Sequence, residues 1–290
     1  MLSLSSHCDT ITVEVANVAL HTEWVRYGEN GQYLGYLAHH DRLSDGQPAV
    51  IVFQEIWGVD DHIQDVVERF ARAGYVALAP DLYAEGGKRK PGLEPEAIEA
   101  VKRFLDSVPP QAWHDAAERD RALETLPEPE RTTVRHTFGQ LFGGLNLDAY
   151  QDQLLAAASF LRDTYPLTKG QPVVSIGFCM GGGLSARLAT LDPKLAGAVI
   201  FYGQAPSADR IPNIQCPVRG FYASLDPRIT DAVPAFAEEM KKAGKNFQYR
   251  VYEGAHHAFF NDTRASYHPR AARSAFAEVL TFFNQVTVGV

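Results

Sequence analysis

The sequence has few cysteines, no excess of positive charge and no long hydrophobic run. Its 290 residues include only 3 cysteines, Cys8, Cys179 and Cys216, without a Cys-x-x-Cys pair. An odd and scattered set of this kind argues against a disulfide framework and against a structural zinc site. It is typical of free thiols in a reducing compartment.

Charge and hydropathy argue against two further classes of protein. The 27 Lys and Arg residues are outnumbered by 35 Asp and Glu residues, so there is no electrostatic basis for binding nucleic acid. No stretch approaches the roughly 20 apolar residues of a membrane span, and the first ten residues lack the features of a targeting peptide. We therefore expect a cytoplasmic protein with no membrane or nucleic-acid partner, either a monomer or a homodimer.

The chain does have enough apolar material for a large core. Apolar residues make up 46% of it and charged residues 21%, as in a folded globular protein. Residues 10–38 alternate apolar and polar side chains, which predicts strands near a sheet edge. Residues 49–54 are apolar on both faces, as in a buried parallel strand. The helical pattern that follows stops at Gly74, and a second buried run ends at Pro80.

Strand, helix and strand in this order predict a right-handed crossover and hence an α/β domain. The alternation resumes in the second half of the chain. Helices are expected at about 147–164, 180–191, 232–244 and 269–284, with strands at 172–178, 197–203, 217–223 and 246–253. We therefore predict a doubly wound, mostly parallel sheet, which binds ligands at the carboxyl ends of its strands.

The alternation fails between Glu85 and Gly144. This segment is helix-like and charged, and prolines interrupt it at positions 91, 95, 109, 110, 127 and 129. We predict a single α/β domain over residues 1–290, with 85–144 as an insertion of short helices over the carboxyl edge of the sheet. Such an insertion is a candidate cap, and the alternative is a structural decoration at the side.

The stretch "GFCMG", Gly177 to Gly181, places a cysteine between a predicted strand and a predicted helix. This is the Gly-x-nucleophile-x-Gly pattern of a nucleophile elbow, in which a strained turn projects the nucleophile and leaves room only for glycine two residues away. The helix N-terminus that follows favours a thiolate. A redox thiol is the alternative; it needs a resolving cysteine, and Cys216 has the pattern of a small buried residue entering a strand.

A thiol needs a base or a positive partner to become a thiolate at neutral pH. In this fold class the acid follows the nucleophile and the histidine comes last. Asp226 follows one predicted strand and is a candidate to orient an imidazole; the alternative is a turn-forming aspartate before Pro227. His256 and His257 follow the next strand. Glu55 directly follows a buried strand, where an unpaired carboxylate is costly. It is either salt-bridged to an arginine or a partner of the thiol.

Five motifs in this order resemble the dienelactone hydrolase (carboxymethylenebutenolidase) family: "QEIWG" at 54–58, "PDLYA" at 80–84, "GFCMGG" at 177–182, "LD" ending at 226 and "GAHHAFFND" at 254–262. The likeness covers the chain from about residue 32 to the end, without the insertion. It implies an α/β-hydrolase fold, a Cys-His-Asp triad, and neither a metal nor an organic cofactor.

The resemblance also implies roles for single residues. Cys179 would be the nucleophile, Asp226 the acid and His257 the base, because the family writes Gly-Ala-x-His. Glu55 matches the glutamate that contacts the resting thiol. The oxyanion hole would consist of two backbone N–H groups, that of Ile56, which follows Glu55, and that of Met180, which follows Cys179. Trp57, Tyr83 and Arg264 are the candidates for binding substrate.

The sequence departs from the family at the two arginines that hold a substrate carboxylate. Glu85 and Asn261 occupy those positions, and the candidate cations to replace the arginines are Lys88, Arg89 and Arg264. We expect hydrolysis of a small-molecule ester or lactone through a thioacyl-enzyme. The alternatives are a short-chain carboxylesterase without the anionic clamp, and a non-catalytic ligand-binding or redox-thiol protein on the same scaffold.

Overall fold

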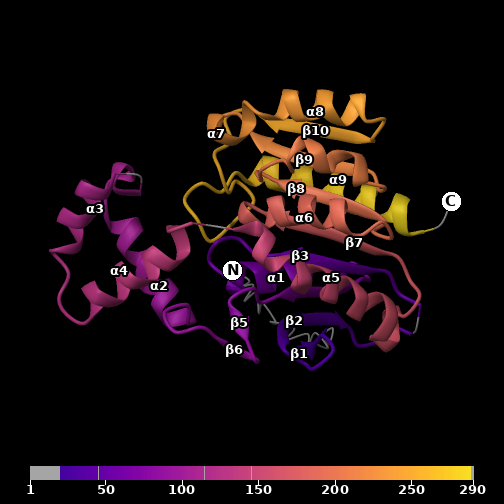
Figure 1. Cartoon of the computed structure of the whole chain (residues 1–290), viewed down its shortest axis with the longest axis horizontal. Coiled ribbons are helices and arrows are strands. Elements are labelled where there is room, and N and C mark those ends of the chain that lie inside the picture. The colour runs from indigo at the N-terminus through magenta and orange to yellow at the C-terminus, as the bar shows by residue number, and fades with distance from the viewer. Residues whose placement is uncertain (1–19, 45, 114, 145, 289–290) are drawn as a thin grey trace, which may run out of the picture.

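The computed structural model describes residues 20–288 except 45, 114 and 145, so the part of the predicted strand-rich entry before Leu20 lies outside it. Eight strands form one sheet in the order β1-β2-β4-β3-β7-β8-β9-β10 (Figure 1). Their bounds are Leu20–Tyr27 (β1), Tyr33–His40 (β2), Ala49–Phe53 (β3), Val76–Pro80 (β4), Val173–Phe178 (β7), Gly197–Phe201 (β8), Val218–Ala223 (β9) and Phe247–Tyr252 (β10).

The pairing of the strands confirms the predicted, mostly parallel sheet. β1 pairs with β2, and β2 with β4, in antiparallel fashion, whereas β4, β3, β7, β8, β9 and β10 are joined by parallel pairs. From β3 the chain goes to β4 on one side and later returns to β7 on the other. The switch point of this doubly wound sheet therefore lies between β3 and β7, where such sheets bind ligands beyond the carboxyl ends of the strands.

Helices cover both faces of the sheet, which explains why the central strands are apolar on both faces. Val50 and Val52 of β3 belong to a core shared with α1 and α9, and Ile51 and Phe53 to a core shared with α5, α6 and α8. The bounds of these helices are Asp61–Arg72 (α1), Gln151–Ser159 (α5), Met180–Leu191 (α6), Val233–Lys242 (α8) and Pro269–Thr287 (α9), with a short α7 at Pro227–Thr230.

Helix α1 shows how the local sequence sets these elements. Asp60 caps its N-terminus by accepting a hydrogen bond from the Ile63 N–H at 3.1 Å, an interaction worth about 1 kcal/mol. The apolar residues at helical spacing are fully buried against the sheet. Gly74 follows the helix with φ +96°, a conformation that favours glycine and ends the helix as predicted.

Three local features differ from the sequence-based expectations. The helix expected at 147–164 begins as a 3-10 turn, Leu147–Tyr150, and ends as a π-helical turn, Phe160–Thr164; the last helix continues to Thr287. A two-stranded hairpin, β5 (Ala84–Glu85) with β6 (Lys88–Arg89), opens the insertion. Its signal was present in the sequence, because a Gly-Gly pair between two short strands is typical of a tight hairpin turn.

In its described part the insertion then forms the helices α2 (Pro95–Ser107), α3 (Ala116–Leu123) and α4 (Glu130–Phe142), with a 3-10 turn at Pro110–Trp113. They project to one side of the sheet in Figure 1. They build a third apolar core of their own. This core also takes in Ile56, Trp57 and Tyr83, which follow β3 and β4. The insertion is therefore attached at the carboxyl ends of these two strands. Within the described residues no helix is both long and apolar enough to cross a membrane.

Candidate active site

Cys179 lies at a sharp turn between β7 and α6. Its backbone has φ 55° and ψ −115°, a strained conformation for a residue with a side chain. The flanking glycines are required by space: a Cβ on Gly177 would lie 1.8 Å from the Gly181 carbonyl oxygen, and one on Gly181 would lie 2.3 Å from the Phe53 oxygen. The structure thus has the strand-to-helix turn that the pattern Gly-x-Cys-x-Gly predicts.

His257 is held by Asp226. Nδ1 of His257 lies 2.5 Å from Oδ2 of Asp226, which follows β9 and is 5% exposed. Asp226 precedes the first residue of α7 but makes no capping hydrogen bond, so its carboxylate is available to the imidazole. The alternative interpretation, a turn-forming aspartate before Pro227, does not account for this contact of the side chain. The neighbouring His256 is exposed.

The surroundings of His257 favour its protonated form. Burial lowers the pKa of the imidazole, but its interactions with the Asp226 carboxylate and with the Cys179 sulfur outweigh burial and raise the pKa to about 10. Both partners gain from a positive charge on the ring. The site therefore holds an imidazolium beside the Cys179 sulfur at neutral pH, and a neighbouring cation of this kind is typical of reactive cysteines.

Cys179 and His257 face the same cavity, which has a volume of about 220 Å³. Its other walls come from the 3-10 turn after the insertion, from α6, from the end of β8 and from α7; the residues are Leu147, Met180, Gly183, Tyr202, Gln204 and Ile229. None of these is a cation. Larger hollows lie beside α2 and along β9, β10 and α9, but neither is lined by Cys179, so cavity size alone does not mark the site.

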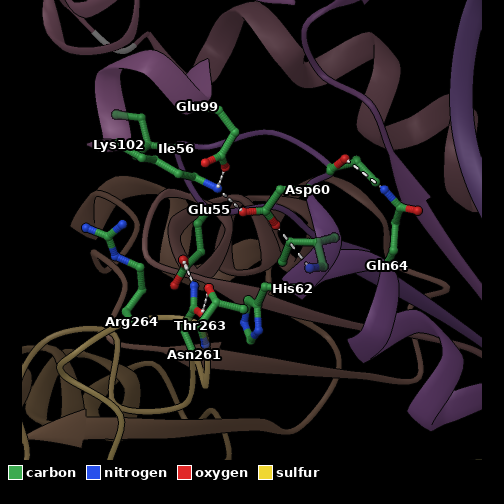
Figure 2. Close-up of polar contacts among 12 residues, drawn as sticks. Glu55, Ile56, Asp60, His62, Gln64, Glu99, Lys102, Asn261, Thr263 and Arg264 are labelled. Atoms are coloured by element: carbon green, nitrogen blue, oxygen red, sulfur yellow. Dashed lines mark hydrogen bonds and ion pairs between the residues drawn. The ribbon is translucent and has the colours of Figure 1, made fainter. Parts of the chain in front are cut away.

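Glu55 is 3% exposed and contacts Tyr202, one of the residues that line this cavity; both of its carboxylate oxygens are hydrogen-bonded. The Tyr202 hydroxyl donates to Oε1 at 3.3 Å, and the Asn261 side-chain amide donates to Oε2 at 2.7 Å. The Asn261 oxygen in turn accepts from the N–H and the hydroxyl of Thr263, as Figure 2 shows. The hydrogen-bond partners of Glu55 are thus neither the thiol nor an arginine, and Tyr202 and Asn261, which donate to it, come from two other loops.

Tyr202 was not singled out by the sequence. It is fully buried, its ring lies 5.0 Å from the His257 ring, and its backbone has φ 37°. The described residues include two other non-glycine positions with positive φ, Cys179 and Ala258. All three lie at or next to the cavity, and strained backbone of this kind gathers at functional sites. The sequence pattern placed Tyr202 inside the strand expected at 197–203, whereas β8 ends one residue before it, at Phe201. Its place at the carboxyl end of a buried strand was the feature that could have identified it.

The two expected oxyanion donors lie on either side of the switch point. Met180 is the first residue of α6, so its N–H has no acceptor within the helix, and its side chain lines the cavity. Ile56 lies in the loop after β3, and its carbonyl accepts a 2.7 Å hydrogen bond from the Tyr83 hydroxyl. Tyr83 is buried and contacts this loop through its hydroxyl. It was expected to bind substrate, but it does not line the cavity.

The other residues expected to bind substrate lie within the insertion or contact it. Trp57 is buried in the third core. Arg264 pairs with Asp106 of α2 at 2.8 Å. Arg89 pairs with Asp81 at 2.7 Å and also donates to the Val59 carbonyl, while Lys88 is exposed on the β5–β6 hairpin. None of these cations lines the cavity that contains Cys179.

The second described cysteine is remote from the first. Cys179 follows the carboxyl end of β7, whereas Cys216 precedes the amino end of the parallel strand β9. A strand of this length spans roughly 17–20 Å, and a disulfide needs Cα atoms within about 7 Å. Burial also raises the pKa of the Cys216 thiol to about 12. These two cysteines are not placed to form a redox pair.

No group of three or more His, Cys, Asp or Glu side chains in the described part of the chain is placed to hold a metal ion.

Comparisons with known proteins agree with the fold described above. The model of the dienelactone hydrolase family matches residues 34–287. A presumed carboxymethylenebutenolidase of Saccharolobus solfataricus is 35% identical over 240 residues, which cover 82% of this chain and 90% of that protein. One of Synechocystis is 33% identical over 271 residues, covering 88% and 92%. The crystal structure of a presumed dienelactone hydrolase from Klebsiella pneumoniae matches with a TM-score of 0.62 at 25% identity, covering 92% of this chain and 99% of that one. The expected α/β-hydrolase fold is confirmed.

Proposed function

Since this chain belongs to the dienelactone hydrolase family, we propose that it hydrolyses a carboxylic ester or lactone through a thioacyl-enzyme on Cys179. The observation that carries the proposal is the shared cavity of Cys179 and His257, with His257 bonded to Asp226. A nucleophile, a base and a group that orients the base are the parts that acyl transfer needs.

The proposed reaction uses these groups in turn. The Cys179 thiolate attacks the carbonyl carbon, and the N–H groups of Ile56 and Met180 hold the negative oxygen that forms. Collapse of this intermediate breaks the bond to the alcohol oxygen, which takes a proton from the His257 imidazolium. Water then attacks the thioester while His257 accepts its proton. The acid is released and the Cys179 thiolate is restored beside the imidazolium.

Mass spectrometry of the intact protein during turnover of p-nitrophenyl acetate tests this proposal. We expect one acetyl group per chain at early times, located on the peptide that contains Cys179, together with a burst of nitrophenol. A burst without acetyl on Cys179 would contradict the proposal. Binding of ester analogues without any turnover would instead support a ligand-binding protein on this scaffold.

The walls of the cavity favour a substrate without a carboxylate. Among the described residues that line the cavity, Gln204 is the polar side chain besides Cys179, His257 and Tyr202, and none is Lys or Arg. The nearest replacements suggested by the sequence, Arg89 and Arg264, are paired with carboxylates elsewhere. The His257 imidazolium in this cavity is already paired with the Asp226 carboxylate, so a substrate carboxylate would have no cation of its own, which is costly. We therefore propose a small neutral ester or lactone rather than an anionic one.

The exposed Gln204 offers a direct test of this selectivity. Gln204→Arg adds a guanidinium to the cavity and is expected to raise the kcat/KM ratio of carboxylate-bearing to neutral esters on the order of tenfold, the effect of about 1.4 kcal/mol. Gln204→Leu is the matched control and should leave the ratio unchanged or lower. A wild-type protein that already prefers the anionic ester would contradict the proposal.

A further inference from the structure

The sequence left open whether the insertion is a cap or a structural decoration, and none of its described residues between 85 and 144 lines the cavity that contains Cys179. We propose that this insertion instead acts as a buttress that positions the loop of residues 55–60, and with it the N–H of Ile56. The inference rests on the proposed function, because it takes Ile56 as an oxyanion donor. The residues that carry it are Lys102 and Asp106 of α2 and their partners Asp60 and Arg264.

Trp57, which directly follows Ile56, is fixed by the insertion on several sides. Its ring meets the ring of Trp113 edge-on at 6.2 Å and that of Phe142 at 6.0 Å. Two cations also lie on it: the Lys102 ammonium 5.8 Å from the ring centre and the Arg264 guanidinium at 5.6 Å. Such contacts contribute about 0.5–1 kcal/mol or more each, so the ring has one well-defined position.

The far end of the loop is tied to α2 by an ion pair. Nζ of Lys102 lies 2.8 Å from Oδ2 of Asp60 and 2.8 Å from Oε1 of Glu99, as Figure 2 shows. Burial alone would lower the pKa of Lys102, but its two carboxylate partners raise it. Asp60 uses its other oxygen to cap α1. One aspartate therefore joins the loop, α1 and the insertion.

Arg264 links the insertion to the loop that follows β10. Its guanidinium makes two hydrogen bonds with the Asp106 carboxylate, at 2.8 and 3.2 Å, and its side chain is 14% exposed. Three residues earlier in the same loop, Asn261 donates to Glu55. The beginning of the 55–60 loop is thus held from the sheet side and its remainder from the insertion side.

Ile56 lies between these two sets of contacts. Glu55 is bonded on one side, Trp57 is packed on the other, and the Ile56 carbonyl accepts the Tyr83 hydroxyl. Its peptide N–H therefore has a fixed direction. Stabilisation of an oxyanion depends on donors that are already in place, and a misplacement of about 1 Å can cost on the order of a hundredfold in rate.

Two charge-removing variants test the buttress. Lys102→Met keeps the aliphatic stem beside Trp57, and Asp106→Asn keeps the shape of the Arg264 partner. Each is expected to lower kcat for a short p-nitrophenyl ester on the order of tenfold with KM unchanged. The rate at which iodoacetamide alkylates Cys179 should not change, because that reaction forms no oxyanion. Glu124→Gln is the matched control: it breaks the pairs with Arg131 and Arg135 within the insertion and should match the wild type.

The outcomes separate this inference from the proposed function. Wild-type kcat in both variants would overturn the buttress and leave the insertion as a structural decoration. A change only in KM or in preferred ester size would overturn it in favour of a cap. Equal losses in kcat and in alkylation rate would overturn it as well, because the defect would then lie at Cys179 or His257. Melting temperatures near that of Glu124→Gln show that the variants are folded. Persistent esterase activity in Cys179→Ala would overturn the proposed function itself.

Discussion

Cys179→Ala is expected to lower kcat/KM for ester hydrolysis by at least about a thousandfold. Removal of the nucleophile abolishes the covalent route, and what remains is the contribution of the oxyanion donors and of binding. The side chain is small and partly exposed, so alanine fits at the strained turn without a large cavity. Initial rates with p-nitrophenyl acetate and with a small neutral lactone measure the effect, and the substrate affinity should stay within a few-fold.

Cys216→Ala is the matched control for this loss. Its thiol is buried in the core on the opposite edge of the sheet, and burial raises its pKa to about 12, so it is almost entirely protonated at neutral pH. We expect wild-type kcat/KM and a loss of stability of about 1 kcal/mol from the deleted sulfur. A Cys179→Ala protein that is as active as Cys216→Ala would remove the cysteine from the mechanism.

Asp226→Asn is expected to lower kcat/KM by about 10²–10⁴-fold and to move its pH dependence. In the wild type the Asp226 carboxylate helps to raise the pKa of His257 to about 10. The imidazolium is needed to protonate the leaving alcohol, so activity should fall as the pH rises through that value. Without the carboxylate the pKa of His257 drops toward its ordinary value, and the alkaline limb of the profile should shift to lower pH.

Profiles of kcat/KM between pH 6 and 11 measure this shift. Asp231→Asn is the control, because Asp231 is an exposed aspartate just beyond the same short helix α7. It should show the wild-type alkaline limb. If Asp226→Asn lost activity but kept that limb unchanged, Asp226 would not act through the protonation of His257.

The parts of the site that follow local rules were accessible from the sequence. The turn around Cys179 depends on two glycines within five residues, and the order of Asp226 and His257 follows from the winding of the sheet. The partners of Glu55 were not accessible. Tyr202 and Asn261 reach it from loops 147 and 206 residues away in the chain, and no periodicity encodes such a meeting.

The insertion shows the same limit for charged residues. That the insertion consists of short helices follows from composition and prolines, whereas their bounds were not predicted. Arg264 was expected near a substrate and instead pairs with Asp106, 158 residues away. The sequence pattern alone does not tell which of the many carboxylates of the chain a guanidinium on a loop will pair with. The choice among them depends on how the insertion is oriented on the sheet, and that orientation is set by the packing around Trp57.

The positive φ angles at Cys179, Tyr202 and Ala258 have a consequence for the evolution of this protein. Each is a place where glycine would relax the backbone, at a cost of order 1–3 kcal/mol for keeping the side chain. At Cys179 and Tyr202 that side chain lines the cavity. Selection for heat resistance alone should therefore favour glycine at these two positions and remove side chains that the site uses. Ala258 has no functional group to lose. It is therefore the position of the three at which stability can be gained while the hydrolytic groups are kept.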